Sequence, residues 1–304
     1  MLDARQLDAL AAVIEHGSFS AAAKALSLTL AAVSLRIKSL EAALGQRLLV
    51  RGKQLRATPA GLALLGHIRQ LRLMEADLLS GFPGGAGKAD SWQSLSVAVN
   101  ADSLSSWFLP GVAAALQQHH LLIDIAVDDQ DHTHDSLKNG DVAGCVTTLA
   151  EAMRGCTAEP LGLMRYRCMA APALLAQWGS VAETGGLALA QRLLRSPAVI
   201  FNRKDGLQDA YLAQHFNLRD ALYPRHVVPA VDGFERALEL GMGWGMVPDL
   251  LRDERTRPNA LQEVWADHPV NVMLYWQHWS REPLAAQRLT QAVKQAARER
   301  LLPG

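Results

Sequence analysis

The chain has 304 residues, of which 49% are hydrophobic, and its 30 basic residues balance 30 acidic ones. This length suits two or three domains of about 100 to 200 residues each. No apolar run approaches the roughly 20 residues needed to cross a bilayer, and no secretory signal pattern is present, so we expect a cytoplasmic protein with no membrane partner. Cys145, Cys156 and Cys168 have no C-x-x-C spacing. This argues against a disulfide framework or a zinc ribbon and favours reduced thiols.

Basic residues are concentrated near the start of the chain. Residues 1–80 contain 10 Lys and Arg against 6 Asp and Glu, whereas residues 81–304 contain 20 against 24. The positive charges of the first segment gather around one acid, Glu41, and belong to Arg36, Lys38, Arg47, Arg51, Lys53 and Arg56. Such a patch attracts phosphates, although a solvated helix face is the alternative interpretation of the patch alone.

Three short helices are predicted in the first 45 residues. The spacing of apolar residues predicts an amphipathic helix over 3–16. Ser18 or Ser20 can cap a second helix, and Thr29 can cap a third, which Gly45 ends. Helices packed in this way form a helix-turn-helix, whose last helix enters the major groove of DNA.

A wing and a long helix are predicted next. Two short apolar runs on either side of a Gly-Lys turn predict a β-hairpin, whose Arg51, Lys53 and Arg56 would meet the phosphate backbone. Pro59, with Thr58 as cap, suits the start of a helix of about 20 residues. That helix carries a long apolar stripe that it cannot bury alone, so we expect it to pair with a second copy of the chain.

The segment AAAKALSLTLAAVSLRIKSLEAALGQRLLVR, followed by ATPAG, resembles the LysR-type transcriptional regulators. The shared features are the paired alanines, Ala-Val-Ser, a basic residue before Ile, Leu-Glu, the terminal Gly and the Thr-Pro-x-Gly after the wing. The resemblance implies a homo-oligomer, a dimer or tetramer, that binds double-stranded operator DNA and works with RNA polymerase. No catalytic spacing such as G-x-S-x-G or H-E-x-x-H is present, so we expect no enzyme activity.

The chain departs from this family where the third helix should face bases. Leu30 and Ala31 stand where the family commonly has Gln and Ser, and Leu35 where it has Arg or Gln. Apolar side chains can touch a thymine methyl but cannot make the bidentate hydrogen bonds that discriminate bases. We therefore expect weak discrimination per base, a steep salt dependence and a preference for deformable A/T-rich operators. The residues predicted to contact DNA are Ser18, Ser20, Thr29, Leu30, Ala31, Ser34, Leu35, Arg36, Lys38, Arg51, Lys53 and Arg56.

A Gly-rich break and an α/β pattern follow. GFPGGAGKADS, residues 81–91, predicts a flexible hinge, and its spacing does not match a phosphate-binding loop. Strands alternate with helices beyond it, which predicts a mostly parallel sheet. The fold class is therefore α/β, with a winged helix-turn-helix at 1–58, a linker and dimerisation helix at 59–80, the hinge, and an effector-binding domain at 92–304.

The effector-binding domain is predicted to have two Rossmann-like lobes. They resemble the periplasmic-binding-protein-like effector domain of LysR-type regulators, with strands that cross between lobes near residues 163 and 275. Lobe I is expected at about 92–163 and 276–304, and lobe II at about 164–275.

Ligands of open α/β sheets lie beyond the carboxyl ends of the strands, a rule that selects several turns in each lobe. Helix N-termini at Ser103 and near Thr147 would bind a carboxylate, and Asp102, Asp128 and Asp129 would bind cations. A ligand with one carboxylate and two cationic groups, lysine or arginine, satisfies both requirements. The residues predicted to bind it are Asn100, Ala101, Asp102, Ser103, Trp107, Asp128, Asp129, Thr147, Thr148, Asn202, Asp205, Val231, Asp232 and Phe234.

A closer resemblance runs over the whole chain. SLSVAVNADSLSSWFLP, MLYWQHW, GLQDAYLAQHF and GMGWGMVPDL resemble the subgroup of LysR-type regulators known as ArgP, LysG or IciA. This resemblance implies that lysine or arginine is the effector, without a cofactor, and that the target is a basic-amino-acid exporter gene.

Other interpretations of the same residues stay open. Asp and Ser are favoured at helix starts whatever the function, so the cleft residues can be simple caps, and Trp107 can pack a core. The histidines of DHTHD and of His119-His120 lack a third ligand at fixed spacing and do not predict a metal site. For the whole chain, the alternatives are an architectural protein that coats A/T-rich DNA and a ligand-binding module with a degenerate DNA-reading helix.

Overall fold

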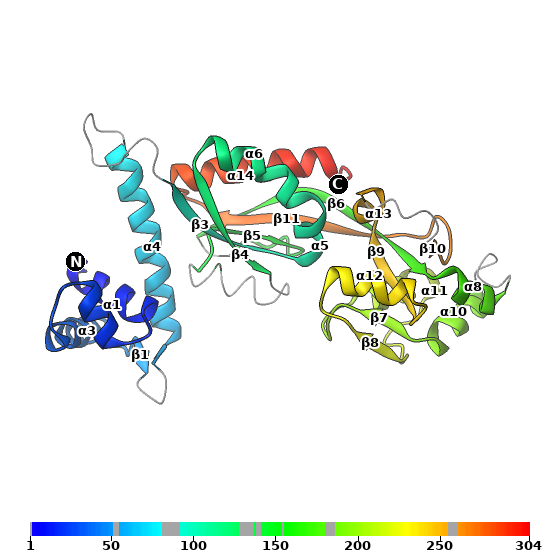
Figure 1. The fold of residues 1–304 in the computed structure, drawn as a ribbon, viewed down its shortest axis with the longest axis horizontal. Helices are drawn as coiled ribbons and strands as arrows, with labels where there is room; N and C mark the ends of the chain where they lie inside the picture. The colour runs from blue at the N-terminus through cyan, green and yellow to red at the C-terminus, as the bar shows by residue number, and fades with distance from the viewer. Residues whose placement is uncertain are drawn as a thin grey trace.

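The computed structural model describes residues 2–50, 55–80, 92–127, 137, 141–153, 155–179, 186–254 and 261–304. Figure 1 shows a small helical domain at the N-terminus, a long helix beside it and an elongated α/β domain. The predicted hinge at 81–91 lies outside the described residues, as do Arg51, Lys53, Asp128 and Asp129. Over the described ranges no single helix is both long and apolar enough to cross a membrane; α2 (Phe19–Ala25) and α3 (Leu30–Leu44) pass that test only as a bent pair.

The first three helices form as predicted, and side-chain caps set where they begin. After α1 (Ala4–Glu15), the Ser18 hydroxyl accepts a 3.1 Å hydrogen bond from the Ala21 amide and caps α2, whereas Ser20 lies exposed within that helix. The Thr29 hydroxyl accepts from the Ala32 amide at 3.2 Å and caps α3, and the chain turns by 107° between α2 and α3. This turn lies within the range of about 90–120° that a helix-turn-helix requires.

The wing is held to the third helix and to the helix that follows. Its strands β1 (Leu49–Val50) and β2 (Arg56–Ala57) pair antiparallel. The Glu41 carboxylate accepts a 2.8 Å hydrogen bond from the Leu48 amide. At the start of α4 (Pro59–Ser80), the Thr58 hydroxyl accepts from the Gly61 amide at 3.1 Å and donates to the Arg47 carbonyl at 2.7 Å. A Cβ on Gly61 would lie 2.2 Å from the Leu48 carbonyl oxygen, so the Thr-Pro-x-Gly motif requires glycine there.

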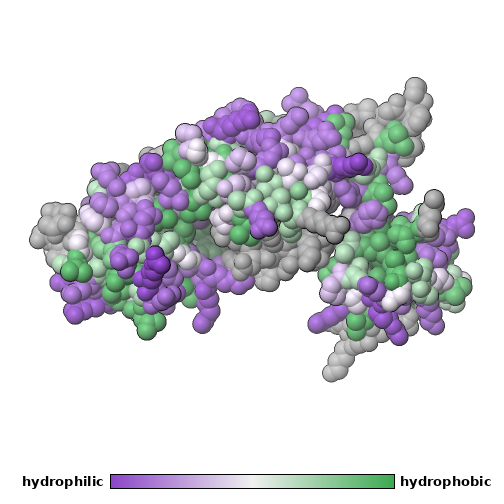
Figure 2. Space-filling model, turned by 180° about the vertical axis from the view of Figure 1, so that it is seen from behind, coloured by the Kyte–Doolittle hydropathy of each residue, from purple (hydrophilic) through white to green (hydrophobic). Residues whose placement is uncertain are grey.

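The apolar stripe of α4 divides into two parts. Leu65 and Ile68 are buried in the core of the N-terminal domain. The expectation that a second copy of the chain covers the whole stripe was therefore wrong for these two residues. Leu71, Met74 and Leu78 stay exposed at 36%, 44% and 64%. From behind, apolar residues gather on the visible face of the N-terminal domain with hydrophilic residues at its rim (Figure 2). Exposed apolar patches of this kind are typical of a surface that a partner covers.

Lobe I of the α/β domain contains three parallel strands, β3 (Gln93–Val99), β4 (Leu121–Val127) and β5 (Gly144–Thr147). One continuous helical segment follows β3, formed by α5 (Ala101–Ser103), a π-helical turn η1 (Leu104–Phe108) and α6 (Leu109–Gln118). The C-terminal helix α14 (Leu284–Arg300) packs against this segment, as Figure 1 shows.

Lobe II repeats the arrangement with β7 (Ala198–Ile200) parallel to both β8 (Arg225–Val227) and β9 (Trp244–Pro248). Its described part also contains the short strand β10 (Gln262–Glu263) and the helices α8 (Pro172–Trp178), α10 (Gly186–Arg195), α11 (Leu207–Phe216), α12 (Val231–Glu239) and α13 (Asp249–Glu254).

Two long strands, β6 (Cys156–Ala170) and β11 (Val270–Trp279), run through both lobes and pair antiparallel. They join the lobes into one sheet of order β4-β3-β5-β11-β6-β9-β7-β8, with β10 paired to β6. The prediction of a mostly parallel sheet therefore holds only inside each lobe, because the crossing strands run against their neighbours. The β6–β11 pairing shifts register between Leu274 and Tyr275, opposite Gly162 and Pro160, where the sequence predicted the crossing.

Candidate functional site

The DNA-reading helix exposes apolar side chains on the surface. Leu30 and Leu35 are 54% and 66% exposed, and Ala31 and Lys38 are exposed beside them. Ser34 is partly buried. The predicted face therefore exists on α3, and its contacts with bases stay a prediction.

The polar and basic residues predicted to contact DNA differ from one another in their hydrogen bonds and exposure. Ser18 and Thr29 act as helix caps, which leaves each hydroxyl hydrogen available for a phosphate. Arg36 is partly buried, with Nη1 3.5 Å from the Arg5 carbonyl oxygen, and Arg56 is exposed on β2. Arg51 and Lys53 lie outside the described residues, so the structure places only the base of the wing.

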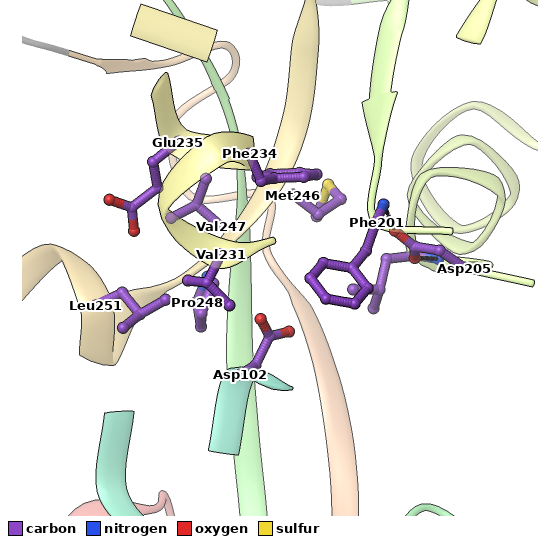
Figure 3. Close-up of a pocket in the computed structure, with 11 residues that line it drawn as sticks. Asp102, Phe201, Asp205, Val231, Phe234, Glu235, Met246, Val247, Pro248 and Leu251 are labelled. Atoms are coloured by element: carbon purple, nitrogen blue, oxygen red, sulfur yellow. Dashed lines mark hydrogen bonds between the residues drawn. The ribbon is translucent and has the colours of Figure 1, made fainter. Parts of the chain in front are cut away.

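A cleft open to solvent, with an empty volume of about 1830 Å³, lies between the lobes at the carboxyl ends of their strands. Six predicted residues line it: Asn100, Ala101, Asp102, Thr148, Asn202 and Asp205. A smaller chamber shares Asp102 and Asp205 with the cleft and is also lined by Val231 and Phe234 (Figure 3). The strand-end rule thus brings together residues from four separate turns.

Several other predicted residues do not face the cleft. Trp107 is completely buried in the lobe I core, with its ring 5.9 Å from that of Phe108, and Ser103 is buried in the same helical segment. Thr147 is buried, and its hydroxyl accepts from the Leu149 amide at 3.2 Å. Asp232 is exposed outside both cavities.

The two helix N-termini predicted to bind a carboxylate also differ from expectation. The helical segment of lobe I begins at Ala101 rather than at Ser103, with Asn100 as its N-cap. No helix begins near Thr147, since described residues 148–153 are irregular. The ligand carboxylate therefore has one candidate helix start in place of the two expected. Asp128 and Asp129 lie outside the described residues.

Asp102 is the central acid of the cleft. The Tyr166 hydroxyl donates a 2.8 Å hydrogen bond to its Oδ2. Burial raises the pKa of Asp102 to about 6; the Tyr166 hydrogen bond opposes the rise, and the negative charges of Asp205 and Glu235 add to it. Asp102 comes from lobe I and the other two acids come from lobe II, so acidic groups from both lobes act on the same space.

Asp205 both caps a helix and lines the cleft. Its two oxygens accept from the Phe201 amide at 2.9 Å and from the Leu207 amide at 3.1 Å, at the start of α11. Burial raises its pKa, and these hydrogen bonds to the charged form act in the opposite direction. The alternative interpretation of Asp205 as a cap is therefore correct for its local structure, and its negative charge still acts on the cleft.

The sequence missed several lining residues. Tyr166 and Leu274 come from the crossing strands, Phe201 directly follows β7, and Glu235 comes from α12. Glu235 lies four residues after Val231 on one helix, a spacing that could have indicated it. Nothing local marks Tyr166, because its role depends on the pairing of β6 with distant strands.

One buried polar atom at the cleft lacks a partner. Asn100 Oδ1 is buried and accepts no hydrogen bond from the residues that the structure describes. Buried acceptors in folded proteins are almost always satisfied, so an orphan at a cavity wall indicates a donor supplied by water or a ligand. Together with the three acids, this acceptor makes the cleft suited to a ligand rich in cationic N–H groups.

Comparisons with known proteins agree with this architecture. Residues 4–62 match the bacterial regulatory helix-turn-helix protein, lysR family, and residues 93–298 match the LysR substrate binding domain. The HTH-type transcriptional regulator ArgP of Pseudomonas fluorescens Pf0-1 is 37% identical over 303 residues, covering 100% of this chain and 99% of its own. The regulator LysG of Mycobacterium tuberculosis H37Rv is 40% identical over 296 residues, covering 97% and 94%.

Two solved structures are similar over nearly the full length. The crystal structure of ArgP from Mycobacterium tuberculosis has a TM-score of 0.88 at 38% identity and covers 100% of both chains. Full-length LysG from Corynebacterium glutamicum with bound effector Arg has a TM-score of 0.79 at 32% identity, covering 99% of this chain and 100% of that one. The chain therefore belongs to the LysR family of bacterial transcriptional regulators and is of the ArgP and LysG type.

Proposed function

We propose that this regulator senses a basic amino acid, arginine or lysine, between its two lobes and controls a basic-amino-acid exporter gene. The observation that carries the proposal is a set of three acids: Asp102 and Asp205 line both the cleft and its chamber, and Glu235 lines the chamber beside them. Carboxylates that raise one another's pKa are stabilised by a cation placed among them. The related LysG was solved with bound Arg, which supports the same class of ligand here.

The chamber walls suit the rest of such a ligand. Phe201, Val231, Phe234, Met246 and Leu251 surround the acids with apolar surface, and Figure 3 shows Asp102 directed among them. The methylene groups of arginine or lysine can lie on these walls while the terminal cation meets carboxylates. An apolar amino acid would bring no positive charge to the acids, and an acidic one would be repelled.

Binding between the lobes has a route to the DNA-binding domain. Lobe I contacts α4, because Arg69 Nη1 lies 3.5 Å from Asp141 Oδ1 and Gln70 donates a 3.1 Å hydrogen bond to the Arg281 carbonyl. A ligand that binds the closed cleft more tightly than the open one shifts the lobes toward closure. This movement would alter the contacts between lobe I and α4. We further propose that α4 pairs two chains, that effector lobes pair dimers into tetramers, and that RNA polymerase responds to the altered DNA geometry.

Calorimetry on the full chain tests the effector class. We expect saturable binding of arginine or lysine at millimolar concentration or below, and none of norleucine or citrulline, which lack the terminal charge. Absence of binding by both basic amino acids would refute the effector assignment. Footprinting then separates regulation from coating of DNA, because a regulator protects a bounded pair of half-sites beside a divergently encoded membrane-protein gene.

A further inference from the structure

Two of the exposed leucines of α3, Leu30 and Leu35, point away from the core of their own domain. Leu35 lies between Val33 and Ile37, which are buried at 0% and 2% exposure, while Leu35 itself is 66% exposed. Residues two apart on a helix of 3.6 residues per turn point in nearly opposite directions. Leu35 is therefore at the centre of the outer face of α3. Leu30, at the start of the helix, is 54% exposed and is not part of the buried core of its domain.

The surroundings of these leucines are cationic. Lys38 lies one turn after Leu35 on the same exposed face, and Arg56 is exposed on the wing. The one acid of α3, Glu41, has its Oε1 engaged with the backbone amides of Leu48 and Leu49. An apolar centre inside a basic rim fits neither a lipid interior nor an apolar protein partner. It fits a duplex, whose phosphates meet the rim and whose groove floor meets the centre.

The floor of the major groove offers one apolar group, the C5-methyl of thymine. A leucine can neither donate nor accept a hydrogen bond, so contact with that methyl is the only favourable base contact open to it. We propose that Leu35 and Leu30 determine operator specificity by packing against thymine methyl groups. This proposal rests on the assignment of the chain as a DNA-binding regulator and names what its recognition helix reads.

The test uses the full chain and a duplex that this chain enriches from a random-sequence pool. Each thymine of that duplex is replaced in turn by deoxyuridine, which removes the methyl and keeps every hydrogen-bonding group. For the wild type we expect about a fourfold loss of affinity at one or two positions per half-site, the fold-change of one methyl-sized group leaving an apolar contact. At such a position, 5-methylcytosine should bind more tightly than cytosine.

Two variants identify the residue. At the position that Leu35 contacts, Leu35→Ala should bind the thymine and deoxyuridine duplexes equally, at about the affinity of the wild type for the deoxyuridine form, whereas a position that Leu30 contacts should keep the wild-type ratio. Leu44→Ala is the matched control, because Leu44 is an exposed leucine at the far end of the same helix, at 40% exposure, and its loss should leave the wild-type ratio unchanged. Equal affinity of the wild type for both duplexes at every position, or an unchanged ratio in Leu35→Ala, overturns the proposal. Failure to enrich any duplex overturns the regulator assignment itself.

Discussion

The Tyr166 hydroxyl donates a 2.8 Å hydrogen bond to the Asp102 carboxylate, and this contact joins a crossing strand to the first helical turn of lobe I. Tyr166 also lies opposite Val270 on β11 and Pro248 on β9, so this residue links the acid of lobe I to strands of lobe II. A cation that binds Asp102 therefore acts at the point where the lobes meet. This position explains how a small ligand can bias the angle between them.

Replacement of Asp102 by Asn should weaken arginine or lysine binding by about 30-fold or more. Truncating one partner of a buried, hydrogen-bonded charge pair costs about 2 kcal/mol or more, and Asn keeps the volume while removing the charge. Calorimetry on the full chain measures the change. Asp232→Asn is the control, since Asp232 is exposed outside both cavities, and an equal loss in both variants would contradict a special role for Asp102.

The affinity for a basic amino acid should fall as the pH falls through about 6. Burial and neighbouring acids raise the pKa of Asp102 from 3.8 to about 6, and only its ionised form attracts a cation. At pH 5 roughly a tenth of Asp102 is ionised, so the affinity should be about tenfold lower than at pH 8. A flat profile in the wild type, or one unchanged in Asp102→Asn, would rule out this origin.

The same raised pKa has the opposite effect on the stability of the unliganded chain. Folded Asp102 holds its proton more tightly than in the unfolded chain, so its contribution to stability is present below about pH 4 and declines as the pH rises to about 6. Denaturant melts of the wild type and Asp102→Asn, compared between these values, isolate this contribution.

Removing the positive charge at Arg56 should weaken binding to all DNA sequences to a similar degree. Arg56 is exposed on β2, where a phosphate contact is expected. Loss of one phosphate contact lowers the slope of log affinity against log salt by about 1. Fluorescence anisotropy over a salt series measures that slope for wild type and Arg56→Ala. A loss confined to one sequence would instead indicate base contact.

Gly61→Ala should destabilise the N-terminal domain by about 1–3 kcal/mol. The added Cβ would lie 2.2 Å from the Leu48 carbonyl oxygen, and backbone cannot move aside cheaply. Chemical denaturation followed by circular dichroism gives the free energy of unfolding. Gly206→Ala is the comparison, because no atom lies within 4 Å of its added Cβ and its φ of −100° is ordinary.

Local signals made the N-terminal elements predictable from sequence. Ser18, Thr29 and Thr58 each cap the helix that follows them, and Gly45 ends α3 with a φ of 65°, so the boundaries depend on a few neighbouring residues. The strand-end rule found Asp102 and Asp205 for a similar reason, because both lie within a few residues of the end of a strand, between β3 and α6 and between β7 and α11.

Long-range packing was not predictable in the same way. GMGWGMVPDL contains β9, and the glycine before this strand is needed for close approach to a distant turn: a Cβ on Gly243 would lie 2.2 Å from the Pro197 carbonyl oxygen. Trp107 packs in the core, as the alternative interpretation of this residue had it, and it lies in a π-helical turn, which rotates the residues that follow relative to an α-helix.

We propose above all that a basic amino acid bound between the lobes changes how this regulator binds DNA. Footprinting of one enriched duplex with and without arginine or lysine tests it most directly. The account predicts that one of these ligands alters the protected region for the wild type and leaves it unaltered for Asp102→Asn. Identical protection by the wild type with either ligand and without ligand, at concentrations that saturate the cleft, would contradict it.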